Sequence, residues 1–222
     1  MATWQSASYE GRYLQLSISE TVNTIANTST LNWTLTSTGG SVNYYTVDAT
    51  TVTINGTQVY YKARTSWDSK VFPAAKGSTS GSITVAHNAD GSKSITVGFS
   101  TRVYVYGPQE YGGTMTLTKI DRAAPTVSFS TSSITANGFK ISASASATCD
   151  TWQYSTNNGS SWTTFSSTAG TSASTTLSSL SPNTSYTVKV RARKKSNQVY
   201  GTSSASTVKT LGGSVVNSVS AV

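Results

Sequence analysis

The feature of this sequence that most constrains its fold is an alternation of apolar and polar residues, which repeats in short runs along the chain. Runs such as TTVTI and TQVYY place apolar side chains at every second position, which is the period of a β-strand. Ser and Thr supply about a third of the residues, charged residues make up only 11%, and runs with helical spacing are missing. The sequence therefore predicts an all-β fold.

The alternation is interrupted once in a way that indicates a domain boundary. In KIDRAAPTVSF, Pro125 and two alanines separate a run that ends at Leu117 from one that resumes at Val127. We therefore expect two β-sandwich domains in tandem, residues 1–122 and 123–211, followed by a C-terminal tail of residues 212–222.

In the first domain, eight strands are expected, and one turn fixes a register. Asn55-Gly56 between two alternating runs favours a type I′ hairpin turn, because both central positions of that turn need positive φ. This places Val52 opposite Val59 and Ile54 opposite Thr57. The expected strands are residues 13–19, 30–36, 42–47, 50–54, 57–61, 82–87, 94–105 and 114–118.

The stretch ITVAHNADGSKSITVGFS contains the single histidine of the chain, His87, three residues before Asp90. It invites either a catalytic interpretation or a simple turn. A three-residue loop ending at Gly91 would place Val85 opposite Ile95 and keep the apolar residues on one face. Because this hairpin accounts for the stretch and leaves His87 at a tip where no third group orients it, we favour the turn.

The same register predicts a contact surface. If Ile95, Val97 and Phe99 face inward, then Arg102, Tyr104 and Tyr106 further along the same strand face outward. Trp67 lies in a loop sequence. Exposed aromatic rings beside polar groups suit saccharide binding. The alternative is that the tyrosines cover a neighbouring loop or the domain joint, whereas Trp33 should lie in the core. The candidate glycan contacts are Trp67, Arg102, Tyr104, Tyr106 and Tyr111.

The second half contains the most specific motif. In LSSLSPNTSYTVKVRA, a proline turn precedes Tyr186, and Val188 and Val190 follow at period two, as in the tyrosine corner of fibronectin type III domains. Trp152 stands where such domains bury a tryptophan. Residues 124–211 thus resemble a fibronectin type III-like module, which implies a second sandwich of fibronectin type III or Ig-like type.

Residues 1–120 resemble the N-terminal region of a family of minor structural, tail-associated proteins of phages that infect Gram-positive bacteria. The matching phrases are GRYLQL, LNWTLTSTGGSVNYY, TVTINGTQVYYKARTSW, VFPAAKGSTSG, HNADGSKSITVGFS and YGGTMTLTKI. The resemblance implies a virion component exposed to the host surface and oligomeric within the particle. Its partners would be other virion proteins and host cell-wall glycan or teichoic acid; it brings no catalytic site. The N-terminal residues MATWQSASYEGRYLQL have no basic patch followed by an apolar core, so we expect synthesis in the host cytoplasm without a signal peptide.

The charge is concentrated in the second half. The chain has 16 Lys and Arg against 8 Asp and Glu, and residues 121–222 carry eight of the basic residues but only two of the acidic ones. Alternation places several cations on one strand face, where they would meet an anionic partner such as teichoic acid or an acidic face of another virion subunit. The alternative is a solvated edge strand that discourages pairing. Nucleic acid is not expected, because aromatic residues do not interleave with the strip, which consists of Lys189, Arg191, Arg193, Lys194 and Lys195.

The sequence offers few residues that could serve in catalysis or bind a metal ion. Cys149 is the single cysteine, no disulfide can form within the chain, and the carboxylates are scattered without a local signature. We expect no enzyme activity, no cofactor, no metal motif and no membrane insertion, although a structural calcium held by loop carbonyls stays open.

The sequence thus predicts a structural component of a bacteriophage virion, associated with the tail and binding host-surface glycan. One alternative is a capsid decoration or fibre-anchoring protein that contacts only other virion proteins. A remote alternative is a glycan hydrolase.

Overall fold

The computed structural model describes residues 1–8, 13–38, 50–62, 78–101 and 109–213. The described residues form fifteen β-strands and no helix, so the all-β prediction is confirmed. The chain divides into two compact units, Met1–Asp121 and Arg122–Val222. This division lies one residue before the boundary expected from the sequence.

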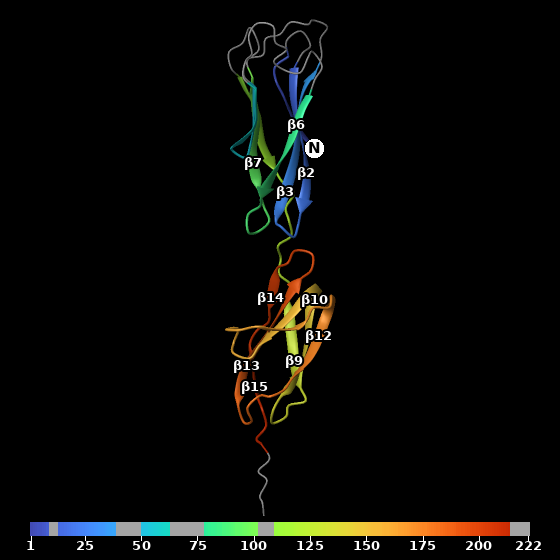
Figure 1. Ribbon diagram of the computed structural model, residues 1–222, viewed down its shortest axis with the longest axis vertical. Coiled ribbons are helices and arrows are strands. Elements are labelled where there is room, and N and C mark those ends of the chain that lie inside the picture. Colours follow the sequence, from blue (N-terminus) through green and yellow to red (C-terminus); the bar gives the residue numbers. More distant parts are fainter. Residues whose placement is uncertain (9–12, 39–49, 63–77, 102–108, 214–222) are drawn as a thin grey trace, which may run out of the picture. The chain divides into compact units, whose positions relative to one another are not determined.

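The first unit contains two four-stranded antiparallel sheets (Figure 1). One has the order β1-β2-β3-β6, and the other has the order β5-β4-β7-β8. The strands of the first sheet are β1 (Ala2–Gln5), β2 (Tyr13–Asn23), β3 (Thr28–Thr38) and β6 (Ser78–Ala86). Those of the second are β4 (Thr50–Ile54), β5 (Thr57–Lys62), β7 (Ser94–Thr101) and β8 (Gln109–Thr116).

Alternate residues of both sheets meet in one core, which makes the unit a β-sandwich. Leu16, Leu31 and Leu35 of one sheet and Val52 and Ile54 of the other have no exposed surface. Trp33 is also buried, as expected, and its indole lies against β6 at Gly81, where a Cβ atom would stand 2.8 Å from the ring. The period-two pattern in the sequence therefore records which side chains face the opposite sheet.

The predicted pairing of Val85 with Ile95 is wrong. Val85 of β6 lies opposite Ser29 of β3, and Ile95 of β7 lies opposite Met115 of β8. The connection from His87 to Lys93 therefore passes from one sheet to the other. Its tip is still a tight turn, since Asn88 N donates to Ser92 O at 2.9 Å and Gly91 has φ 80°.

The Asn55-Gly56 turn is confirmed, with φ values of 51° and 75° and Ile54 opposite Thr57. However, Val52 lies opposite Tyr60 and not Val59, because the register shifts between Val52 and Thr53. β1 was not expected, and β8 begins at Gln109, five residues earlier than predicted. The expected strand 42–47 and the end of 94–105 lie outside the described residues.

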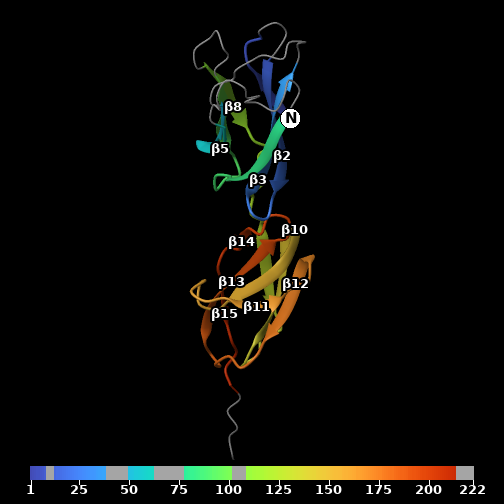
Figure 2. The same ribbon diagram turned by 45° about the horizontal axis from the view of Figure 1, so that its top comes forward.

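In the second unit, one long strand belongs to two groups of strands (Figure 2). Residues 139–145 of β10 pair with β9 and β12, residues 151–155 pair with β11 and β13, and Cys149 between them pairs with both β12 and β13. The strands are β9 (Val127–Ser132), β10 (Phe139–Ser155), β11 (Thr163–Ser166), β12 (Gly170–Leu177), β13 (Ser185–Lys194), β14 (Tyr200–Thr202) and β15 (Ser206–Lys209).

The two landmarks of the second unit lie where the sequence predicts them. Trp152 is fully buried in a core that both parts of β10 share. The hydroxyl of Tyr186 accepts a hydrogen bond of 2.9 Å from the backbone N of Ser181, five residues upstream. This is a tyrosine corner, and with the strand pairing it confirms a fibronectin type III-like sandwich.

Candidate functional site

Most of the expected glycan contacts cannot be placed. Trp67, Arg102, Tyr104 and Tyr106 lie outside the described residues. Tyr111 lies on β8 opposite Phe99, half-buried, with the two ring centroids 5.4 Å apart. Its hydroxyl donates to the Gln109 side chain. The ring of Tyr111 therefore packs against the inner face of its sheet.

The basic strip lies on the outward face of β13. Val188, Val190 and Ala192 of this strand have no exposed surface, so Lys189, Arg191 and Arg193 between them point away from the core. The edge-strand alternative is wrong, because β13 pairs with β10 on one side and with β14 and β15 on the other. A central strand needs no charges to prevent further pairing.

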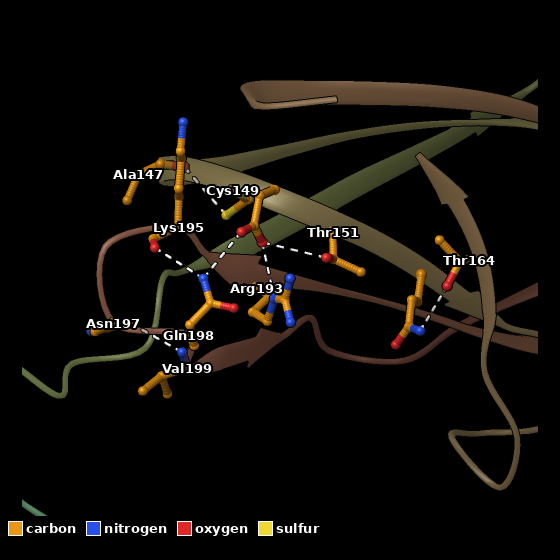
Figure 3. Close-up of polar contacts among 11 residues, drawn as sticks. Ala147, Cys149, Thr151, Thr164, Arg193, Lys195, Asn197, Gln198 and Val199 are labelled. Carbon is orange, nitrogen blue, oxygen red and sulfur yellow. Dashed lines mark hydrogen bonds and ion pairs between the residues drawn. The ribbon is translucent and has the colours of Figure 1, made fainter. Parts of the chain in front are cut away.

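Arg193 is neutralised by a neighbouring acid. Its Nε donates to Asp150 Oδ1 at 2.9 Å, and Gln198 Nε2 donates to Asp150 Oδ2 at 3.1 Å. Thr151 adds a third contact to the carboxylate (Figure 3). Burial acts to raise the pKa of Asp150, but the hydrogen bonds from Arg193 and Gln198 outweigh it and hold that pKa below its usual value.

The last two cations of the strip lie at the turn between β13 and β14. Lys194 N donates to Val199 O at 2.9 Å, and Gln198 N donates to Lys194 O at 2.8 Å. The Gln198 side chain also donates to Lys195 O at 3.0 Å (Figure 3). The turn is thus held by backbone contacts, and the Lys195 side chain is exposed.

Arg191 lies between two aromatic rings. Its Cζ is 4.4 Å from the centroid of Trp162 and 4.6 Å from that of Tyr200, and its Nε donates to Gln153 Oε1 at 2.6 Å. Two aromatic rings thus contact the strip from other elements, although no aromatic residue interleaves with the cations along β13 itself. A guanidinium held between two rings is attracted to both faces and loses much of its rotational freedom.

The two rings come from neighbouring elements. Trp162 immediately precedes β11, after a turn in which Asn158 and Gly159 have positive φ of 61° and 92°. Tyr200 begins β14 and lies opposite Arg193. Sequence reasoning missed both rings because they contact Arg191 across strands, and the alternation within β13 carries no information about its partners.

Together these contacts define a basic–aromatic face, consisting of Lys189, Arg191, Trp162 and Tyr200. The Asp150 carboxylate is committed to Arg193, whereas Arg191 donates its hydrogen bond to the neutral amide oxygen of Gln153. A fixed guanidinium beside a lysine suits the oxygens of phosphate or carboxylate groups, which it can bind with two parallel hydrogen bonds. The face can therefore bind an anionic ligand.

The geometry around His87 differs from the exposed tip that was expected. His87 is 8% exposed, its Nδ1 lies 2.8 Å from Gly91 O, and its Nε2 lies 2.8 Å from Ser29 Oγ. Ser29 Oγ in turn donates to Glu20 Oε1 at 2.6 Å. Because Ser29 has no exposed surface, this hydroxyl cannot reach a substrate as a nucleophile.

The single cysteine and the remaining possible metal ligands also form no reactive site among the described residues. Cys149 is fully buried, and burial raises the pKa of its thiol, so the reactive thiolate is disfavoured. In the part of the chain that the structure describes, no group of three His, Cys, Asp or Glu side chains could hold a metal ion. The search of the described residues also finds no helix long and apolar enough to cross a membrane.

No protein-family model matches the sequence, and no curated protein does. Among solved structures, the chain is similar to a chicken interferon gamma receptor alpha chain, with 11% identity over 87% of this chain and 97% of that one, at a TM-score of 0.32. It is also similar to the central fibronectin-III array of RIM-binding protein, with 15% identity over 90% of this chain and 69% of that one, at a TM-score of 0.30. A third similar structure is the FN1-FN3 portion of chicken CNTN1, with 15% identity over 81% of this chain and 62% of that one, at a TM-score of 0.33.

Proposed function

We propose that the chain is a non-enzymatic structural component of a phage virion, associated with the tail, and that it binds anionic glycopolymers of the host cell wall. The virion setting rests on the resemblance of residues 1–120 to tail-associated structural proteins. The binding role rests on the basic–aromatic face of the second unit. Teichoic acid, whose repeating phosphates carry the negative charge, is the ligand class that fits this face.

The observation that carries the proposal is the stack of Trp162, Arg191 and Tyr200. Holding a long side chain in one position before binding reduces the entropy that binding would otherwise cost. Lys189, two residues away on the same strand face, supplies a second positive charge. A repeating anion can therefore meet two cations at the spacing of alternate residues on one strand.

Binding of the full chain to purified wall teichoic acid tests the ligand class. We expect the Arg191→Ala variant to bind at least about tenfold more weakly in calorimetry, the equivalent of one bidentate charge-assisted contact. Arg191→Lys should recover only part of the loss, because an ammonium lacks the planar fork.

Lys140→Ala is the matched control, since it removes one exposed charge from β10, outside the basic–aromatic face. Equal weakening by Arg191→Ala and Lys140→Ala would indicate general charge attraction and contradict the assignment to this face. Added salt should weaken wild-type binding in either case.

The virion setting has its own test. Purified particles of the source phage should contain the chain at a fixed stoichiometry by quantitative mass spectrometry. An electron-microscopy map should place it on the tail. Density on the capsid alone would favour the decoration role, and absence from purified particles would remove the virion proposal.

A further inference from the structure

A hollow of about 490 Å³ lies on the outer face of the β5-β4-β7-β8 sheet in the first unit. The side chains of Val52, Ile54, Val97 and Phe99 face the core, so the alternate residues of β4, β7 and β8 line this outer face. Residues Thr96, Glu110, Gly112 and Thr114 on it are exposed. The hollow is therefore open to solvent and separate from the basic–aromatic face.

Two glycines form the floor of the hollow. Gly98 of β7 and Gly112 of β8 lie directly opposite each other and carry no side chain. A Cβ atom at Gly112 would lie 2.1 Å from the carbonyl oxygen of Val97, so the two backbones approach too closely for any other residue. The floor consists of peptide backbone, below the level of the neighbouring side chains.

A row of four residues crosses the sheet beside this floor; Thr51, Ser100 and Glu110 line the hollow, and Tyr61 lies next to it on the edge strand β5. The strand registers place Tyr61 of β5 opposite Thr51 of β4, Thr51 opposite Ser100 of β7, and Ser100 opposite Glu110 of β8. Directly opposed residues in a sheet project from the same face. Tyr61 is 56% exposed, and Thr51 Oγ1 and Ser100 Oγ are hydrogen-bonded at 2.5 Å. An aromatic ring thus stands at one end of the row, a carboxylate at the other, and two hydroxyls between them.

We propose that this hollow binds an uncharged oligosaccharide. The C–H face of a sugar ring can stack on Tyr61, while Glu110 accepts hydrogen bonds from sugar hydroxyls, and Thr51 and Ser100 both donate and accept them. With strands about 4.8 Å apart, the row is about 14 Å long, which is enough for more than one sugar ring. The carboxylate of Glu110 disfavours phosphate-bearing polymers, so this hollow and the basic–aromatic face select different ligands.

The inference rests on the proposed host-surface role for its setting, but its test does not depend on that role. Uncharged hexasaccharides of glucose, galactose and N-acetylglucosamine would be titrated into the isotope-labelled full chain and followed by amide NMR shifts. We expect at least one of them to shift amides of β4, β7 and β8 selectively. Tyr61→Ala should weaken that binding about tenfold, and Tyr61→Phe should not, because the ring carries the stacking.

Two further variants sharpen the comparison. Glu110→Gln should weaken binding several-fold, because an amide is a poorer acceptor than a carboxylate. Ile25→Ala, an exposed apolar residue between β2 and β3, is the control and should leave binding unchanged. The inference is overturned if none of the hexasaccharides shifts these amides, or if Tyr61→Ala and Glu110→Gln bind as tightly as the wild type. If the chain binds a hexasaccharide but not teichoic acid, the proposed anionic ligand is contradicted, whereas the assignment of this hollow to uncharged saccharides stands.

Discussion

Both ring nitrogens of His87 lie within hydrogen-bond distance of a partner. Gly91 contributes a carbonyl oxygen, which only accepts, so Nδ1 carries a hydrogen. Ser29 has a single hydroxyl proton, and it is donated to Glu20 when that carboxyl is ionised. Nε2 lies 2.8 Å from the same Ser29 hydroxyl, so that the imidazole ring and the carboxylate share one serine. The conspicuous histidine therefore links β2, β3 and the turn before β7.

Glu20 makes this network sensitive to acid. Burial acts to raise the pKa of the Glu20 carboxyl, but hydrogen bonds from Ser29 and Thr118 outweigh it and leave that pKa below the ordinary value. A lowered pKa in the folded state stabilises the protein above the unfolded-state pKa, and this stabilisation is lost as the pH falls through the folded-state value.

We therefore expect the free energy of unfolding of the wild type to fall as the pH drops below the ordinary carboxyl pKa of 4.5. Glu20→Gln should be less stable than the wild type near neutral pH and show a shallower decline in acid. Urea unfolding between neutral and strongly acidic pH measures both effects. Ile25→Ala, an exposed substitution that removes no carboxyl, serves as the control and should keep the wild-type slope. A Glu20→Gln curve parallel to the wild type would show that the network does not titrate with folding.

Individual strands show how far alternation determines a β-structure. It correctly placed Ile95, Val97 and Phe99 on the inner face, and the Asn-Gly pair correctly placed a turn. It could not predict that Val85 pairs with Ser29, because alternation specifies which side of a strand is buried and leaves its neighbour open.

The basic–aromatic face could likewise be predicted only in part from the sequence. The outward cations of β13 were foreseen, but the rings on either side of Arg191 come from sequence segments about 30 residues before it and 9 residues after it, at Trp162 and Tyr200. Contacts of this kind depend on strand order and register, which a single sequence does not fix.

The close approach of β7 and β8 gives a prediction at this scale. Gly112→Ala would place its Cβ against the Val97 carbonyl oxygen, and relieving that clash should separate the two strands. We expect a loss of about 2–3 kcal/mol in the free energy of unfolding, measured by urea denaturation. Gly212→Ala, where a Cβ would meet no atom within 4 Å, is the matched control. A Gly112→Ala protein as stable as this control would contradict the described strand register.

Within the described ranges, the buried apolar residues form two hydrophobic cores with separate membership. One gathers buried residues from β2, β3, β4 and β7, and the other gathers them from β10, β13 and neighbouring strands. A unit with its own core can fold by itself. Each unit is of ordinary domain size, so neither needs a disulfide to be stable.

We expect residues 122–222, produced alone, to unfold in one cooperative transition followed by circular dichroism. Trp152→Ala in this fragment should cost about 3–5 kcal/mol, because it empties the largest fully buried position of the second core. An exposed substitution, Leu211→Ala, should change little. A fragment without a cooperative transition would show that the second core is insufficient by itself.

The continuity of β10 has a consequence for how the second unit could be taken apart. Residues 139–145 of this strand pair with β9 and β12, residues 151–155 pair with β11 and β13, and Cys149 pairs with both β12 and β13, so residues 146–149 form the covalent passage along β10 from one set of partners to the other. Cutting the chain there would turn one strand into two and leave only non-covalent contacts to hold its halves in line. Resistance of this short segment to proteases would report the strength of the hydrogen bonds that hold it, from Ser146 N to Thr126 O at 2.9 Å and from Lys195 N to Thr148 O at 3.0 Å.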